Sequence, residues 1–115
     1  MFKITYLKHF DSIEKRKGWF GRVKKIKVRS HKPVFNCKLT FGGEKAANVL
    51  FNISSLKETE LWNEEIDLKK NINFSGPPMS CGDIVVVLDY RTTETKYLEC
   101  REKDWAVINK PKIIP

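Results

Sequence analysis

The chain has 115 residues, of which 41% are hydrophobic and 31% charged, and its formal net charge is +8. This length suits one domain, residues 1–115, with enough core to fold without a metal or a disulfide. The composition excludes a disordered chain, and no apolar run approaches the ~20 residues that cross a bilayer. We therefore expect a soluble protein that does not bind membranes.

The chain start and the cysteines bear on the compartment. Met1–Lys8 alternates polar and apolar residues and lacks the apolar stretch of a secretory signal. The three cysteines, Cys37, Cys81 and Cys100, are an odd number at wide spacings. Such spacing fits a reducing compartment better than a disulfide framework, so we expect a cytoplasmic protein.

The positive charge is concentrated at the N-terminal end. Residues 1–42 hold twelve Lys and Arg against two carboxylates, whereas residues 43–104 hold eight against twelve. Such asymmetry indicates association with nucleic acid or with an acidic partner, and it says nothing about fold.

The elements of the first third are expected to be strands, within residues 2–41. Residues 2–7 alternate as a first strand, and His9–Gly21 is too short and too rich in glycine for a helix, so we expect a loop, with at most one helical turn over residues 11–17. Val23–Arg29 and Val34–Phe41 then alternate with a period of two and are separated by His31-Lys32-Pro33. We predict that these two runs pair as a long hairpin.

One helix is expected in the middle of the chain. Residues 44–54 place Ala46, Ala47, Leu50 and Phe51 at helical spacing. Residues 55–78 are expected to be a connection with Trp62 packed against the domain edge, ending in the break Ser75-Gly76-Pro77-Pro78.

The C-terminal part, residues 79–108, is built around the apolar run Ile84–Leu88 after a Gly-Asp turn signal. The alternating run Lys96–Arg101 completes a hairpin with Leu98 and Cys100 on one face, Trp105–Ile108 adds a last strand, and residues 109–115 form a tail. The predicted fold class is α+β: a small, mainly antiparallel, twisted sheet of about five strands with one helix packed on a face. Leu50, Phe51, Val85, Val87 and Leu98 are the predicted core.

Catalytic and metal motifs are sparse, so we expect no enzyme and no cofactor or metal. There is no phosphate-binding glycine loop and no paired Cys or His spacing for zinc. Cys81 is a candidate nucleophile with His9 or His31 as base, although a small residue entering a strand explains it equally well. Asp83 is a candidate general base, but an Asx bond that stabilises the turn is the commoner role.

The strongest candidate site is the basic hairpin of residues 15–38, which contains ten Lys and Arg. Cations interleaved with aromatic residues are typical of proteins that bind single strands or RNA. The alternative is a solvated strand edge, because lysines also protect edges from aggregation. The predicted binding residues are Arg16, Lys17, Trp19, Phe20, Arg22, Lys24, Lys25, Lys27, Arg29 and Lys32.

The chain contains the segment Pro78-Met79-Ser80-Cys81-Gly82-Asp83-Ile84-Val85, followed by a hairpin to Cys100 and a strand with Trp105. This arrangement resembles small uncharacterised bacteriophage and plasmid proteins related to the YodL-like domains. Their Ser-x-Gly-Asp-Val turn follows a short helix that has Asn near its end, as Ala46–Asn52 does here. The chain departs from this pattern at Asp104, where a Gly is usual, and it lacks the Arg that often precedes the turn. The resemblance implies a mobile-element origin and no particular activity.

Three functional hypotheses follow. The first is a phage-type, anti-defence protein that docks on an acidic host protein or a nucleoprotein complex through the basic hairpin and inhibits or modulates it. The second is an accessory protein that binds nucleic acid with the same surface, and the third is an enzyme. We favour the first because one hairpin carries the charge and residues 43–104 are net acidic.

Overall fold

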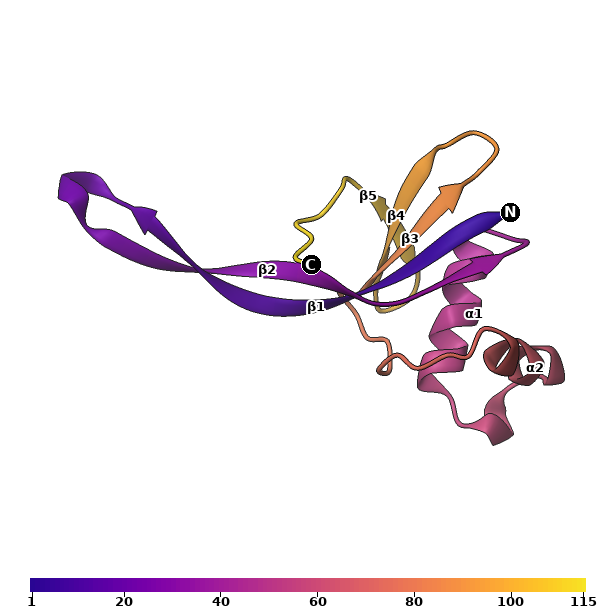
Figure 1. Cartoon of the computed structure of the whole chain (residues 1–115). Helices are drawn as coiled ribbons and strands as arrows, with labels where there is room; N and C mark the ends of the chain where they lie inside the picture. Colours follow the sequence, from indigo (N-terminus) through magenta and orange to yellow (C-terminus); the bar gives the residue numbers. More distant parts are fainter.

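The computed structural model describes residues 1–115 and contains one five-stranded antiparallel sheet in the order β2-β1-β3-β4-β5 (Figure 1). The strands are β1 (Phe2–Lys17), β2 (Val23–Leu39), β3 (Ile84–Asp89), β4 (Thr95–Cys100) and β5 (Trp105–Ile108). Two helices, α1 (Gly43–Ser55) and α2 (Asn63–Asn71), lie between β2 and β3 in the chain. The predicted α+β class with a mainly antiparallel sheet is confirmed.

The first two strands are much longer than predicted. β1 continues through residues 8–17, where a loop or a helical turn was expected, and pairs with β2 from Phe2↔Leu39 to Lys17↔Val23. The predicted hairpin between Val23–Arg29 and Val34–Phe41 is wrong, because the first run and the second run as far as Leu39 belong to the single strand β2. The weak strand propensity of residues 8–17 was overridden by a continuous ladder of backbone hydrogen bonds between the two strands.

Pro33 lies inside β2 without ending it. The pairing register shifts between Tyr6 and Leu7, so Tyr6 faces Phe35 while Leu7 faces Pro33. This bulge leaves Val34 as an extra residue on β2. A proline, which has no N–H to donate, is tolerated because β2 is the outermost strand and its other edge has no neighbouring strand at this point.

The core lies between one face of the sheet and α1. Ile4 and Tyr6 from β1, Val85 and Val87 from β3 and Leu98 from β4 are buried there, and α1 adds a stripe of four buried residues at helical spacing. That stripe is Ala46, Ala47, Leu50 and Ile53. The predicted core is confirmed, except that Phe51 is only half-buried against it.

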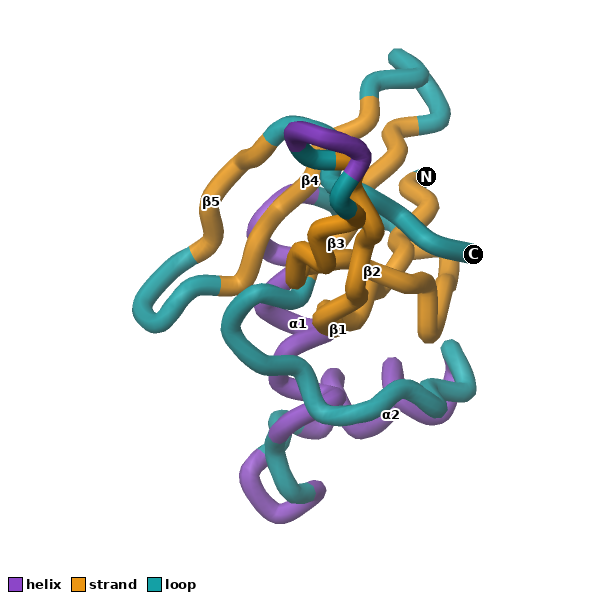
Figure 2. The backbone as a smooth tube through the Cα atoms, turned by 90° about the vertical axis from the view of Figure 1, so that its left-hand side faces the viewer, coloured by secondary structure: helices purple, strands orange, loops and turns teal.

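A second helix occupies part of the predicted connection of residues 55–78. α2 begins after Trp62, and the Glu65 carboxylate accepts hydrogen bonds from the Trp62 backbone N–H and from the Asn52 side chain. Trp62 is 76% exposed, so its predicted packing against the domain edge is wrong. Both helices lie on the same side of the sheet (Figure 2), and neither is long and apolar enough to span a membrane.

The C-terminal residues are tied to the sheet. β3, β4 and β5 form the predicted C-terminal hairpin and last strand, with Leu98 and Cys100 both buried. The tail of residues 109–115 returns to β2, where His31 donates its backbone N–H to the Lys112 carbonyl (3.0 Å) and its carbonyl accepts from the Ile114 N–H (2.8 Å). The tail thus covers the outer edge of β2 at one point.

Replacing Leu50 with alanine is expected to lower the free energy of unfolding by about 2–5 kcal/mol, because the side chain is 1% exposed in the core. Ile13→Ala removes a similar side chain that is 71% exposed, and we expect a change within about 0.5 kcal/mol. Chemical denaturation of both variants measures the difference. Similar losses for the two would mean that α1 is not packed as described.

Candidate binding arm and its root

The outer parts of β1 and β2 form a two-stranded arm, residues 8–32. β3 pairs with β1 only from Phe2 to Leu7, so beyond this point each strand of the hairpin has only the other as a neighbour, apart from the tail at His31. The arm projects far from the body in Figure 1 and makes the molecule 61 Å long against 35 and 25 Å in the other directions. Beyond its root, where Ser30 and His31 are buried, this ribbon presents both faces and both edges to solvent.

The tip of the arm exposes two aromatic side chains. Trp19 is 88% exposed and Phe20 96% exposed, and their ring centroids lie 6.3 Å apart. The turn is closed by a 2.6 Å hydrogen bond from the Gly18 N–H to the Arg22 carbonyl, and Phe20 has a φ of 63°, in the left-handed region. A bulky residue in this conformation is strained, and strain of this kind clusters at functional sites.

The outer arm, residues 15–25, contains six cations and no carboxylate. In the strand register Lys15 lies opposite Lys25 and Arg16 lies opposite Lys24. Like charges directly opposite each other destabilise a strand pair. The outer arm is therefore held together against its own electrostatic repulsion.

Two of the cations closer to the body, Lys27 and Lys32, have partners within the chain. Lys27 pairs with Asp11 (3.2 Å), and Lys32 lies over the Phe10 ring, 5.9 Å from its centroid. Glu14 lies within ion-pair distance of Lys112 and, at 3.4 Å, of Arg16. Among the cations of the outer arm, only Arg16 has an ion pair. This pair is weak because it is exposed to solvent.

The ten predicted binding residues thus divide into two groups. Lys27, Arg29 and Lys32 lie toward the root of the arm, and Arg29 reaches the turn before β3, where a Cβ added to Gly82 would lie 3.0 Å from an Arg29 guanidinium nitrogen. The other seven lie on the outer arm and its tip: Arg16, Lys17, Trp19, Phe20, Arg22, Lys24 and Lys25.

The root of the arm is organised by Asp83, whose side chain is 0% exposed. The carboxylate accepts hydrogen bonds from the backbone N–H groups of His9 (3.0 Å) and Ser80 (2.8 Å) and from the Lys8 ammonium (2.8 Å). The His9 ring Nδ1, the Tyr6 hydroxyl (3.2 Å) and the Ser80 hydroxyl (3.4 Å) complete the shell. These partners from β1 were missed, because nothing in the sequence shows that residues 6–9 lie beside residue 83.

The surroundings of Asp83 keep it ionised. Burial alone would raise the pKa of this carboxyl, but the hydrogen bonds from His9, Lys8 and Ser80 outweigh burial and hold the pKa below its ordinary value. Burial, together with the nearby Asp83 charge, raises the pKa of the Tyr6 hydroxyl, so Tyr6 stays a neutral donor. Asp83 is therefore an anion that joins β1 to the turn before β3.

The histidines considered as bases for Cys81 have structural partners. His9 Nδ1 bonds Asp83, and His31 Nε2 donates to the Gly82 carbonyl (2.9 Å). His31 Nδ1 is buried without a hydrogen-bond partner. Cys81 itself is exposed at the turn. This arrangement favours a supporting role for the Ser80–Asp83 turn over a nucleophilic one.

Comparison with known proteins finds no matching family model, no similar characterised protein and no similar solved structure. The resemblance to YodL-like proteins stays a prediction, and function has to be argued from the arm and its root.

Gly82→Val is expected to destabilise the protein by roughly 1–3 kcal/mol or more, because Gly82 has a φ of +96° and its Cβ would crowd Arg29 and His9. Gly18→Ala is the matched control, since Gly18 has a φ of −90° and its Cβ would have only one contact, at 3.4 Å. Thermal unfolding of both variants tests this expectation. An unchanged midpoint for Gly82→Val would show that the turn does not need a glycine.

Asp83→Asn is expected to lower the free energy of unfolding at neutral pH by about 3 kcal/mol, because it removes one partner of a buried ion pair. The wild-type carboxyl has a folded pKa below its unfolded value of about 3.9, so its contribution is complete above that pH and is lost as the pH falls below it. Denaturant unfolding from neutral to acidic pH should therefore bring the two proteins closer together below about pH 4. A constant gap throughout would contradict this assignment.

Proposed function

We propose that this protein is a non-catalytic binding protein that docks on a negatively charged host partner through its basic arm and thereby modulates or inhibits that partner. The observation that carries the proposal is the outer arm, where six cations without a carboxylate surround two exposed aromatic rings. Charge supplies the long-range attraction to an anionic partner, and large aromatic side chains supply the short-range contact energy that anchors interfaces.

The energetics of the isolated arm support a binding role. Two adjacent like-charge pairs and a strained, exposed Phe20 all disfavour the free hairpin, and a two-stranded ribbon has little stability to spare. Edge protection needs only scattered lysines. An anionic partner would offset the repulsion and cover the rings, so the clustered charge and the exposed aromatic surface that disfavour the free arm both favour binding.

The class of partner follows from the charge of the arm. An acidic host protein or a nucleoprotein complex is complementary to it, and the resemblance to proteins of phages and plasmids supports a role in modulating a host or its defences. A nucleic-acid-binding accessory protein is the second candidate, because the alternating cations and the tip aromatics also suit phosphates and bases.

The double variant Lys24→Glu, Lys25→Glu separates binding from folding. It converts both like-charge pairs into opposite-charge pairs, with Arg16 and Lys15, so the thermal midpoint should stay the same or rise. Binding should fall by about a hundredfold, because like charges brought together at an interface repel by several kcal/mol. Calorimetric melting and capture of partners from host lysate measure the two effects.

The matched control is Lys3→Glu, Lys103→Glu, which changes net charge equally at two exposed positions of the body. This control should bind as the wild type does. Equal losses for both double variants would show that net charge, and not the arm, directs binding. Nuclease treatment of the lysate distinguishes a protein partner, whose capture persists, from a nucleic acid, whose capture is lost.

A further inference from the structure

The cations of the outer arm lie on both faces of the ribbon. Successive residues of a strand point to opposite faces, so Lys15 and Lys25 share one face while Arg16 and Lys24 share the other. Lys17 adds to the first face, and Arg22 lies at the tip. A folded acidic protein that docks against one face would leave the cations of the opposite face without partners.

We infer that the outer arm enters a groove of double-stranded DNA, with phosphates of both strands against its two faces. The inference rests on the proposed function, because it requires the arm to be the binding surface. It goes further in naming the chemistry of the partner. A groove is bounded by a row of phosphates on each side, which matches a ribbon with cations on both sides.

The dimensions of a β-ribbon suit B-form DNA. The two strands are ~4.8 Å apart, and the major groove, about 12 Å wide, admits a two-stranded β-ribbon with its side chains. The major groove of double-stranded RNA is too narrow and deep for such an insertion. Duplex DNA is therefore the form that fits, and single strands and RNA are alternatives for the test to distinguish.

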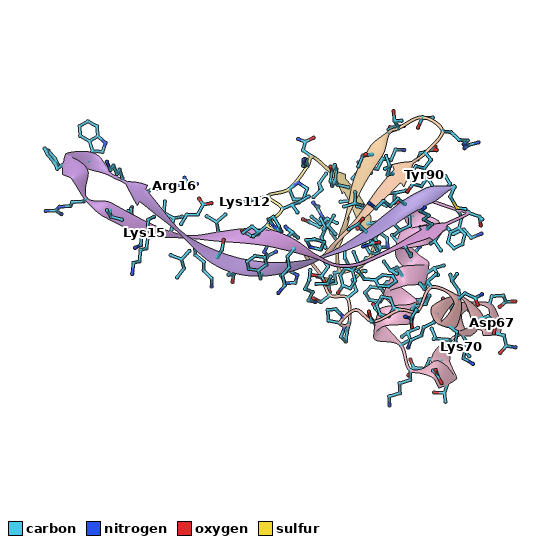
Figure 3. The ribbon with its side chains drawn as sticks, viewed as in Figure 1. Lys15, Arg16, Asp67, Lys70, Tyr90 and Lys112 are labelled. Carbon is cyan, nitrogen blue, oxygen red and sulfur yellow. The ribbon has the colours of Figure 1, made fainter.

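The length of the arm keeps the body away from the phosphates. Residues 8–17 of β1 extend past the end of β3, which at about 3.3 Å per residue gives a reach of roughly 30 Å. Residues 43–104 carry more carboxylates than cations, and Figure 3 shows Asp67 at the opposite end of the molecule from Lys15 and Arg16. This separation lets a net-acidic body coexist with a DNA-binding arm.

The tip supplies the contact with bases. The turn holds Trp19 and Phe20 outward, away from the body, and both side chains are almost fully exposed. In the major groove, apolar side chains contact base edges such as the thymine methyl group, and they carry no charge that binds phosphate. The cations should therefore set the salt dependence of binding, and the rings should add affinity that does not depend on salt.

The test measures binding of the full chain to a fluorescent DNA duplex of about 20 base pairs, to one of its strands and to the equivalent RNA duplex. The DNA duplex should bind tightest, and six phosphate contacts predict a slope of about −5 for log affinity against log salt. Lys24→Glu, Lys25→Glu should reduce the size of this slope by about 2, because each contact contributes about 0.9. Trp19→Ala, Phe20→Ala should weaken binding about tenfold or more with the slope unchanged, since it removes two aromatic anchors of the interface without removing a charge.

Four results would overturn the inference. Tighter binding to the single strand or to the RNA duplex would assign the arm to a different nucleic acid. Binding to DNA that is equal for the wild type and for Lys24→Glu, Lys25→Glu would place the contact elsewhere. If the chain binds no nucleic acid but captures a host protein from nuclease-treated lysate through Lys24 and Lys25, the inference fails and the proposed function stands. If Lys24→Glu, Lys25→Glu changes neither DNA binding nor capture of a host protein, both the inference and the proposed function fail.

Discussion

The structure depends on one buried carboxylate. Asp83 joins the turn before β3 to β1 through backbone and side-chain donors of residues 8 and 9, just where β1 loses its neighbour β3 and continues as the arm. A buried anion is stable only when its lone pairs are satisfied, and here six donor groups satisfy them. The position and direction of the arm are therefore set by an ionic contact at its root.

This root allows the arm to be poorly stabilised in itself. A hairpin without a third strand or a hydrophobic face is marginal alone, and repulsion between Lys15 and Lys25 weakens it further. The body offsets this weakness, because β1 and β2 continue into the core at Ile4, Tyr6 and Leu39 and the tail adds hydrogen bonds at His31. Stability is thus concentrated in the body, and the arm is left free to carry charge and aromatic surface for a partner.

Much of the body was predictable because its signals are local. The apolar run of β3, the alternation of β4 and the helical spacing of Ala46, Ala47 and Leu50 each reflect burial on one face, and burial produces a period that can be read from the chain. The long arm was not predictable in this way. Residues 8–17 alternate poorly, since neither face of the ribbon is covered beyond its root, and only pairing with β2 makes them a strand. α2 was missed for a similar reason, because it buries little apolar surface.

The sequence by itself determined the composition of the candidate surface, the class of fold and the residues of the core, because charge and hydrophobic period are properties of the chain. The tertiary structure alone decided three things: that Trp19 and Phe20 stand at the tip of a projecting ribbon, that like charges face each other across it, and that Lys8 and His9 enclose Asp83. All three depend on strand register and on contacts between residues up to 75 positions apart. Such contacts arise from the packing of the whole chain, and no local pattern encodes them.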